Sequence, residues 1–364
     1  MNEMAELAPS RVTIREVAEQ AGVSIATVSR VLNGRDDVAP ETRELVSQII
    51  RDRGYIANRS ARGLSGGRTG LIGVLVPLVY PVYFSAILAG ASEALHERDL
   101  RAVLSHTGHE HDREQVQIDR MMHGLTDGAL IVLPEESSDE LSRLLDAGYH
   151  FVVVDPRLRL DNRIPSVSAA HSSGASQAMQ HLLSLGHRRI AAITGPRGWV
   201  ATEDRLRGYY AALAGAGIMP DPEIEVESNF EIGGGESATR TLLDLADPPT
   251  AIFAFNDNLA IGAVRAAQAR GLRVPGDLSI VGFDDTEHAM IVTPALTTVR
   301  QPLAEMGRTA VSLLTRLLDR QRFETLHVEL ATRLVAREST GPAPREAPPT
   351  PSSFEPPACA ARAR

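Results

Sequence analysis

Small, polar and cationic side chains recur at helical spacing between residues 24 and 33. If Ser24 is a helix N-cap, its hydroxyl accepts a backbone N–H of the first turn. A rotation of about 100° per residue then gathers five side chains within an arc of roughly 140°. They are Ile25, Ala26, Ser29, Arg30 and Asn33. Arg30 can donate two hydrogen bonds to guanine or hold a phosphate, while Ala26 offers only a methyl contact, for example to thymine. Thr27 and Ser29 suit phosphates or base edges, so this face has the chemistry to read a DNA major groove.

The flanking segments predict the elements that hold this face. Val28, Val31 and Leu32 point away from it, toward a core. A preceding helix over 14–21 would bury Val17, Ala18 and Ala21, with Gly22 in the turn between the two helices. A third helix begins at Pro40, which fits a first helical turn, and ends at Gly54. Its apolar stripe comprises Leu45, Val46, Ile49 and Ile50. These segments predict an all-α helix-turn-helix headpiece over 11–56, with the third helix as scaffold.

A plain two-helix corner of a small helical domain would show the same periodicity, and geometry alone leaves both interpretations open. The pattern V-A-x-x-A-G-V-S-x-x-T-V-S-R-V-L-N resembles the N-terminus of the LacI/GalR family of bacterial transcription regulators. The resemblance implies binding of a pseudo-palindromic operator by a homodimer, since two heads are needed for two half-sites. The headpiece contacts that we expect are Thr13, Ser24, Ile25, Ala26, Thr27, Ser29, Arg30 and Asn33.

Residues 57–70 connect this headpiece to the rest of the chain. Gly63 and the pair Gly66-Gly67 are typical of a flexible linker. The family resemblance implies instead a hinge helix that folds only on DNA and wedges a leucine into the minor groove. Leu64 matches that leucine, and Asn58 and Ala61 match its neighbours; Arg59 lies in the same stretch and is a further expected DNA contact. Both interpretations remain open here.

Charge is unevenly distributed along the 364 residues, whose net charge is −9. Residues 1–68 contain 10 Arg and 9 acidic residues, a net +1, which leaves −10 for the remainder. The weakly positive head should therefore depend on dimerisation and specific contacts rather than on bulk charge. No run of about 18 apolar residues predicts a membrane span, and the first residues lack a secretory signal. The single Cys359 suits a reducing cytoplasm, where we expect the protein to act on nucleoid DNA.

From residue 71 onward, short aliphatic runs alternate with amphipathic segments. The expected strands cover 71–77, 101–107, 128–134, 150–156, 188–196, 250–257 and 277–285. The expected helices cover 84–98, 112–124, 138–147, 172–185, 204–216, 236–246 and 259–270. This alternation predicts two α/β lobes with doubly wound parallel sheets, separated by a cleft. Ligands bind outside the carboxyl ends of such strands, which here carry the segments 77–84, 155–157, 195–199, 256–257 and 284–285.

The body over 71–338 resembles the periplasmic-binding-protein-like effector domain of the same family, in phrases such as TAIFAFNDNLAIGAVRAAQARGLRVPGDLSIVGFDD. The resemblance implies effector contacts by Arg205, Asn256, Asp284 and Gln301. Asp155 at a strand end is a further candidate, and Tyr83, Phe84 and Trp199 could stack on a sugar ring. Bidentate Arg and Asp, together with amides that donate and accept, suit a polyol. We therefore expect a repressor of carbohydrate uptake or catabolism genes that responds to a sugar. A nucleobase, a sugar phosphate or another metabolite remains an alternative effector, and a corepressor-dependent repressor or an activator remains an alternative mode of action.

Some of these residues have simpler interpretations. One of Asp284 and Asp285 could cap a helix, and Asn256 could be an N-cap. The family's usual acidic-Asn pair at the start of the second half is replaced by Ala170-His171, where His171 could cap the helix. This replacement puts the interdomain contacts usual there in doubt.

Other functions lack a sequence signature. GGG at 233–235 is not a phosphate-binding motif, and no Ser, Cys or metal-dependent hydrolase motif stands out, so we expect neither enzyme nor cofactor. His106, His109 and His111 are interpreted as a solvated loop rather than a metal site. A secreted solute-binding protein would carry no such head. We expect residues 1–10 and the Pro-rich 339–364 to be disordered.

Overall fold

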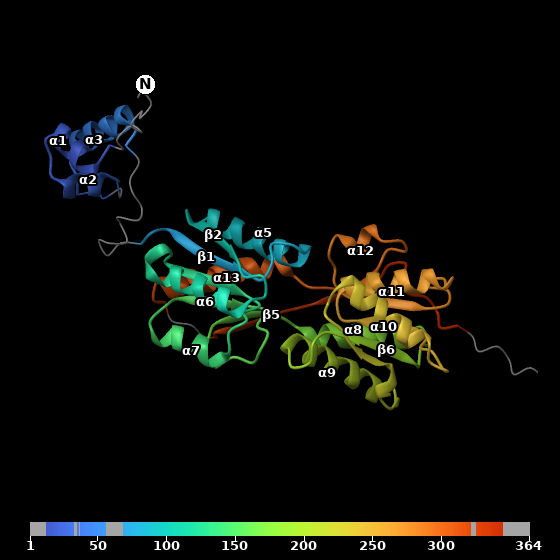
Figure 1. The fold of residues 1–364 in the computed structure, drawn as a ribbon. Helices are drawn as coiled ribbons and strands as arrows, with labels where there is room; N and C mark the ends of the chain where they lie inside the picture. Colours follow the sequence, from blue (N-terminus) through green and yellow to red (C-terminus); the bar gives the residue numbers. More distant parts are fainter. Residues whose placement is uncertain (1–11, 33–34, 36, 56–67, 322–324, 345–364) are drawn as a thin grey trace, which may run out of the picture. The chain divides into compact units, whose positions relative to one another are not determined.

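The computed structural model describes residues 12–32, 35, 37–55, 68–321 and 325–344. The chain divides into two compact units, residues 1–69 and 70–364. Figure 1 traces the elements of each unit along the chain. None of the helices in these described ranges has the length and apolar character that a bilayer crossing needs.

The N-terminal unit is a three-helix headpiece made of α1 (Ile14–Ala21), α2 (Ile25–Leu32) and α3 (Pro40–Arg53). Its small core contains Val17, Val28 and Val46, each fully buried. Gly22 has a left-handed φ of 65° after α1, which allows the sharp turn into α2. The predicted stripe on α3 is wrong at Leu45, which is 49% exposed. Only one face of the 14-residue α3 meets the other two helices, and Leu45 lies outside that face.

The first α/β lobe is built on a six-stranded, fully parallel sheet of order β11-β5-β4-β3-β1-β2. Its strands are β1 (Leu71–Val76), β2 (Arg101–His106), β3 (Gly128–Val132), β4 (Phe151–Val154), β5 (Ser166–Ala169) and β11 (His327–Leu330). The helical segments are α5 (Val82–His96), α6 (His111–Arg120), the kinked turn η1 (Met121–Leu125), α7 (Ser138–Asp146) and α13 (Leu303–Leu318). In Figure 1, α13 carries a late-sequence colour but lies among the blue-green elements of this lobe.

The second lobe contains a sheet of order β12-β10-β9-β8-β6-β7, parallel except for the β10–β12 pair. Its strands are β6 (Ile190–Thr194), β7 (Glu225–Glu227), β8 (Ala251–Ala254), β9 (Ser279–Asp284), β10 (Thr297–Arg300) and β12 (Arg333–Val335). Its helical segments are α8 (His171–Ser184), α9 (Val200–Gly215), η2 (Pro222–Ile224), α10 (Ile232–Leu243), α11 (Asp257–Ala269) and α12 (His288–Ile291). The largest apolar core of the chain fills this lobe around Phe253, Phe255 and Phe283.

The chain crosses between the lobes three times: from β5 to α8, from β10 to α13, and from β11 to β12. The first and third crossings are tied together, because Ala170 N–H donates to the Leu330 carbonyl at 2.9 Å and Thr332 Oγ1 donates to the Ala170 carbonyl at 3.0 Å. The two lobes are thus joined at three points of the chain.

The expected disordered tail is wrong for residues 339–344. Ser339 is fully buried, its Oγ donates to the Ile280 carbonyl at 2.6 Å, and its carbonyl accepts from Ile280 N–H at 2.8 Å. Ala343 N–H donates to the Leu185 carbonyl at 2.9 Å. The Pro-rich composition of the tail predicts disorder. The backbone N–H and C=O groups of these residues nevertheless pair with the second lobe, and such pairing does not depend on the type of side chain. Residues 345–364, and Cys359 with them, lie outside the described residues, as do residues 1–10.

Candidate DNA-reading face and effector pocket

The predicted recognition face is present on α2. Ser24 Oγ accepts from Thr27 N–H at 3.1 Å, which confirms its capping role. Val28 and Val31 are buried on the core side, while Ile25 is 44% exposed and Ala26 and Arg30 are exposed in front. The hydroxyl-bearing Thr27 and Ser29 are half-buried at the edge of this face.

A capping box also defines the start of α1, the helix that precedes the recognition helix in the sequence. Thr13 Oγ1 accepts from Glu16 N–H at 3.3 Å, and Thr13 N–H donates to Glu16 Oε2 at 2.7 Å. These bonds lower the pKa of the exposed Glu16 carboxyl. This reciprocal arrangement defines where α1 begins and leaves the Thr13 side chain exposed.

Arg30 makes a loose ion pair with Asp37, with Nε to Oδ2 at 3.6 Å and both side chains more than half exposed. Exposed pairs of this kind contribute little stability, so Arg30 can leave Asp37 for another anion at small cost. Five predicted contacts fall outside the described residues: Asn33, Asn58, Arg59, Ala61 and Leu64. The hinge therefore stays a prediction.

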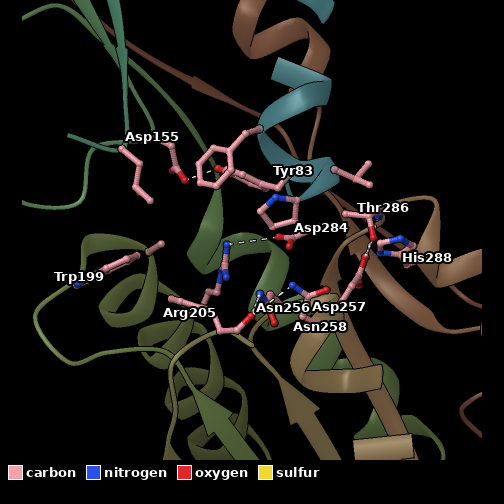
Figure 2. Close-up of a pocket in the computed structure, with 16 residues that line it drawn as sticks. Tyr83, Asp155, Trp199, Arg205, Asn256, Asp257, Asn258, Asp284, Thr286 and His288 are labelled. Atoms are coloured by element: carbon pink, nitrogen blue, oxygen red, sulfur yellow. Dashed lines mark hydrogen bonds and ion pairs between the residues drawn. The ribbon is translucent and has the colours of Figure 1, made fainter. Parts of the chain in front are cut away.

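In the second of the two compact units, which contains both lobes and which we call the effector unit, the carboxyl-terminal ends of both sheets border one pocket (Figure 2). Its space is about 730 Å³, open mouth included. Seven of the eight predicted effector residues line it: Tyr83, Phe84, Asp155, Trp199, Arg205, Asn256 and Asp284. Because parallel strands end at the same edge of a sheet, residues far apart in sequence meet here. The eighth, Gln301, does not reach the wall but donates to Asp284 Oδ1 at 2.6 Å from behind.

Arg205 of α9 is the cationic centre of the wall, although only 3% of it is exposed. Its Nη1 donates to the Phe255 carbonyl, and its Nη2 lies 3.9 Å from Asp284 Oδ1. The guanidinium also stacks on Phe283, with Cζ 3.9 Å from the ring centroid. Its Nε has no hydrogen-bond partner among the described residues. These contacts fix the side chain and leave one buried donor unpaired.

Buried acids surround this arginine. Burial raises the pKa of Asp284 well above its ordinary value, although the charge of Arg205 opposes the shift. Burial likewise raises the pKa of Asp257 to about 7, despite hydrogen bonds from Thr298 and Thr286. Burial also acts on Asp155, but the hydrogen bonds from His171 and Tyr83 and the charge of Arg205 together outweigh it, and the pKa of Asp155 is lowered. The pocket therefore holds acids of different character around one fixed cation.

Aromatic rings form the apolar part of the wall. Trp199 and Phe230 lie with ring centroids 5.7 Å apart, and Tyr83 meets Phe84 edge-to-face at 5.3 Å. A Cβ on Gly195 would lie 1.9 Å from the Phe230 ring, so only glycine lets Phe230 pack there. The Tyr83 hydroxyl donates to Asp155, which turns the ring edge toward the acid. Flat apolar faces and convergent polar groups together are typical of a small-molecule site.

Helix capping was the simpler interpretation for several of the predicted site residues, and it holds for some of them but not for others. Asn256 is an N-cap, since its Oδ1 accepts from Leu259 N–H at 2.8 Å, and it also lines the pocket, so an effector contact stays a prediction. Asp284 lines the pocket, but Asp285 caps no helix and instead pairs with Arg300 and Arg337. His171 is not a cap either: it is the first residue of α8, and the N-cap position, Ala170, has no side-chain bond.

Sequence reasoning missed several wall residues. Asn258 and Thr286 directly follow predicted strand ends, and His288 lies three residues beyond one, so the position of these strand ends is the signal that could have found them. Phe230 had no sequence signal, because it enters the wall from a loop with a left-handed φ of 64°. Of the three histidines predicted to be solvated, His109 and His111 pair with Glu135 and Glu140, each at 3.1 Å.

A helical DNA-reading head joined to a two-lobed ligand-binding body defines a ligand-responsive transcription regulator. Comparisons with known proteins support this class. Residues 13–58 match the family model of bacterial regulatory proteins of the lacI family, and residues 179–340 match a periplasmic binding protein-like domain.

Individual relatives match over nearly the whole chain. The HTH-type transcriptional regulator CelR of Thermobifida fusca is 36% identical over 338 residues, which cover 90% of this chain and 98% of CelR. A solved CelR–cellobiose complex superimposes with a TM-score of 0.68, at 36% identity, covering 90% of this chain and all of that one. The lac repressor dimer, solved with operator and an anti-inducer, gives a TM-score of 0.81 at 31% identity, covering 91% of this chain and all of that one. The chain belongs to the lacI family of bacterial transcription regulators.

Proposed function

We propose that this regulator represses genes for carbohydrate uptake or breakdown, and that an uncharged sugar in the pocket releases it from DNA. The observation that carries the proposal is the wall itself, in which one fixed arginine, several acids and two asparagines converge beside aromatic rings. Carboxylates and guanidinium bridge neighbouring hydroxyls, amides donate and accept, and rings stack on the apolar faces of a sugar. The solved complex of CelR with cellobiose supports this class of effector.

Charge favours a neutral sugar over a sugar phosphate. Asp155, Asp257 and Asp284 line the pocket, whereas Arg205 is its arginine and is already engaged by a carbonyl and an acid. A phosphate placed beside Asp155, whose lowered pKa keeps it ionised, would meet a like charge at low dielectric. We therefore propose hydroxyl-rich, uncharged effectors, and we regard sugar phosphates as the disfavoured alternative.

On the DNA side, we propose that a homodimer places two α2 helices in successive major grooves of a pseudo-palindromic operator. The lac repressor dimer solved on its operator supports this assembly. Arg30 and Ser29 would contact bases or phosphates, and residues 57–70 would order as hinge helices on DNA. Action on operator DNA also implies a cytoplasmic site of action, and a regulatory rather than an enzymatic role.

We propose that the ligand controls DNA binding through the arrangement of the two lobes, which three crossings of the chain connect. A sugar that contacts Asp155 in the first lobe and Arg205 in the second favours the closed arrangement of the lobes. Ligand binding can shift the equilibrium only by its differential affinity for the two arrangements. We propose that closure changes how the two bodies of the dimer meet, and that this change disfavours the DNA-bound hinge.

Arg205→Ala tests the effector role. We expect the full-length protein with this change to bind its own upstream region in a gel shift as the wild type does. Sugars such as cellobiose should no longer release the DNA or change the fluorescence of Trp199, the only tryptophan in the chain.

Arg207→Ala is the matched control, because Arg207 lies on the same helix, has a side chain that is 56% exposed, and pairs with Asp204 on the surface. An unaltered sugar response in Arg205→Ala would remove Arg205 from the site. Absence of any specific complex with the upstream DNA in the wild type would sink the regulatory proposal as a whole.

A further inference from the structure

His171 lies between the two lobes at the first crossing. It begins α8 directly after β5, and only 2% of it is exposed. Its ring packs against Phe283, with centroids 5.9 Å apart. It does not line the pocket, yet both of its ring nitrogens reach residues that do.

The partners of His171 fix its tautomer. Nδ1 lies 3.3 Å from Arg205 Nη2, and a guanidinium can only donate, so Nδ1 accepts. The ring proton is therefore on Nε2, which donates to Asp155 Oδ1 at 3.0 Å. The result is a directional chain in which Arg205 donates to His171 and His171 donates to Asp155.

This chain crosses from one lobe to the other. Asp155 follows β4 of the first lobe and also accepts from the Tyr83 hydroxyl, while Arg205 belongs to α9 of the second lobe. The His171–Asp155 bond joins the first residue of α8, in the second lobe, to the end of β4 in the first lobe. A buried hydrogen bond to a carboxylate is among the stronger ones that a protein makes.

We propose that His171 is a positioning residue that ties the lobes together through Asp155 and so sets how far the cleft closes before any ligand arrives. The proposal rests on the proposed function for its biological meaning, but lobe closure can be measured without a ligand. The two ring nitrogens of His171 make different kinds of contact. The contact of Nδ1 with Arg205 lies within the second lobe, and only the contact of Nε2 with Asp155 joins the two lobes.

Three substitutions divide these contacts. His171→Leu removes both. His171→Asn places its amide oxygen near the position of Nδ1, so it can accept from Arg205 but falls short of Asp155. His171→Gln extends its amide nitrogen toward the position of Nε2, so it can still donate to Asp155.

The experiment measures the distance between the lobes by double electron–electron resonance on the full-length, ligand-free protein. Spin labels are placed by Asp112→Cys in the first lobe and Met219→Cys in the second, in a Cys359→Ser background. Asp112 and Met219 are highly exposed and lie outside the pocket. Excess unlabelled protein dilutes the labelled chains, so that only distances within one chain are measured.

We expect His171→Gln to keep the wild-type distance distribution, and His171→Asn and His171→Leu to shift it toward longer, broader distances. His181→Leu, on the same helix but bonded to Thr340, is the matched control and should leave the distribution unchanged. Identical distributions in all variants would overturn the proposal. If His171→Gln shifts the distance distribution as far as His171→Leu does, His171 acts through packing and the proposal is overturned as well.

A second readout separates this inference from the proposed function. Cellobiose is added to each variant bound to operator DNA, and the concentration that releases half of the DNA is measured. We expect His171→Leu to need about tenfold more cellobiose, the effect of losing one hydrogen bond from the closed state. If the wild type ignores every sugar while the distances behave as expected, the proposed function fails and the role of His171 stands.

Discussion

Burial decides the chemistry of single carboxyl groups in this protein. Glu114 of α6 and Glu136 are each 2% exposed. Burial, then hydrogen bonding to Glu136 and repulsion from its charge, raise the pKa of Glu114 from 4.5 to about 10. Glu114 thus carries a proton at neutral pH, and it accepts from Glu135 N–H at 3.2 Å. This pair lies outside the effector pocket and affects stability rather than ligand binding.

Glu114→Gln should therefore flatten the dependence of stability on pH. The folded protein keeps a proton that the unfolded chain loses, so the contribution of Glu114 to the free energy of unfolding is complete below about pH 4.5 and is lost as the pH rises toward about 10. Glutamine mimics the protonated acid and cannot ionise. We expect the thermal midpoint of the variant to exceed that of the wild type by an amount that grows from pH 6 to pH 9. The exposed neighbour change Glu110→Gln is the control, and a constant difference across this range would contradict the assignment.

At the level of elements, close helix contacts hold the first lobe together across a long sequence separation. A Cβ on Gly307 of α13 would lie 2.2 Å from the Ile87 carbonyl oxygen of α5, and a Cβ on Gly90 of α5 would lie 1.9 Å from that of Ala304. Small residues on both helices thus let the backbones touch. This contact fixes the second crossing, since α13 follows β10 of the other lobe.

Gly307→Ala should destabilise the first lobe by about 1–3 kcal/mol, the usual cost of forcing an extra methyl group into a packed contact. Gly233→Ala in α10 is the control, because a Cβ there meets nothing within 4 Å. Alanine should stabilise that position by about 0.5–1 kcal/mol. Urea unfolding followed by circular dichroism measures both, and equal midpoints for the two variants would refute the close contact.

For the whole molecule, the segment 339–344 closes the second lobe. Ser339 pairs with Ile280 and Thr297, and the buried His187 reaches the Gly341 carbonyl with Nε2 at 3.1 Å. This segment follows β12 and pairs with residues at the start of β9 and β10. Stability of the effector unit thus depends on a stretch that composition alone assigns to a tail.

Ending the chain after residue 338 should destabilise the protein by about 3 kcal/mol or more, since several buried donors and acceptors lose partners worth about 1–3 kcal/mol each. Ending it after residue 344 should leave the thermal midpoint unchanged. Differential scanning calorimetry of the two truncations distinguishes them. Equal midpoints would mean that the segment contributes no stability.

The sequence by itself determined the local features. Helix caps at Thr13 and Ser24, the two-sided pattern of α2 and the aliphatic strands of both lobes depend on neighbouring residues and on side-chain periodicity. The polar ends of those strands were also readable, which is why seven of the eight predicted effector residues line one pocket. The helices α9 and α10 begin four residues earlier than expected, because their first turns are poor in periodic apolar residues.

Only the tertiary structure decided which distant segments meet. It returned α13 and β11 to the first lobe, brought Phe230 into the pocket wall and placed His171 between Asp155 and Arg205. Such contacts depend on the complementary surfaces of packed elements, and no local pattern records which surfaces will match. The residues that could bind a sugar were therefore readable from the chain, while the link between the lobes was not.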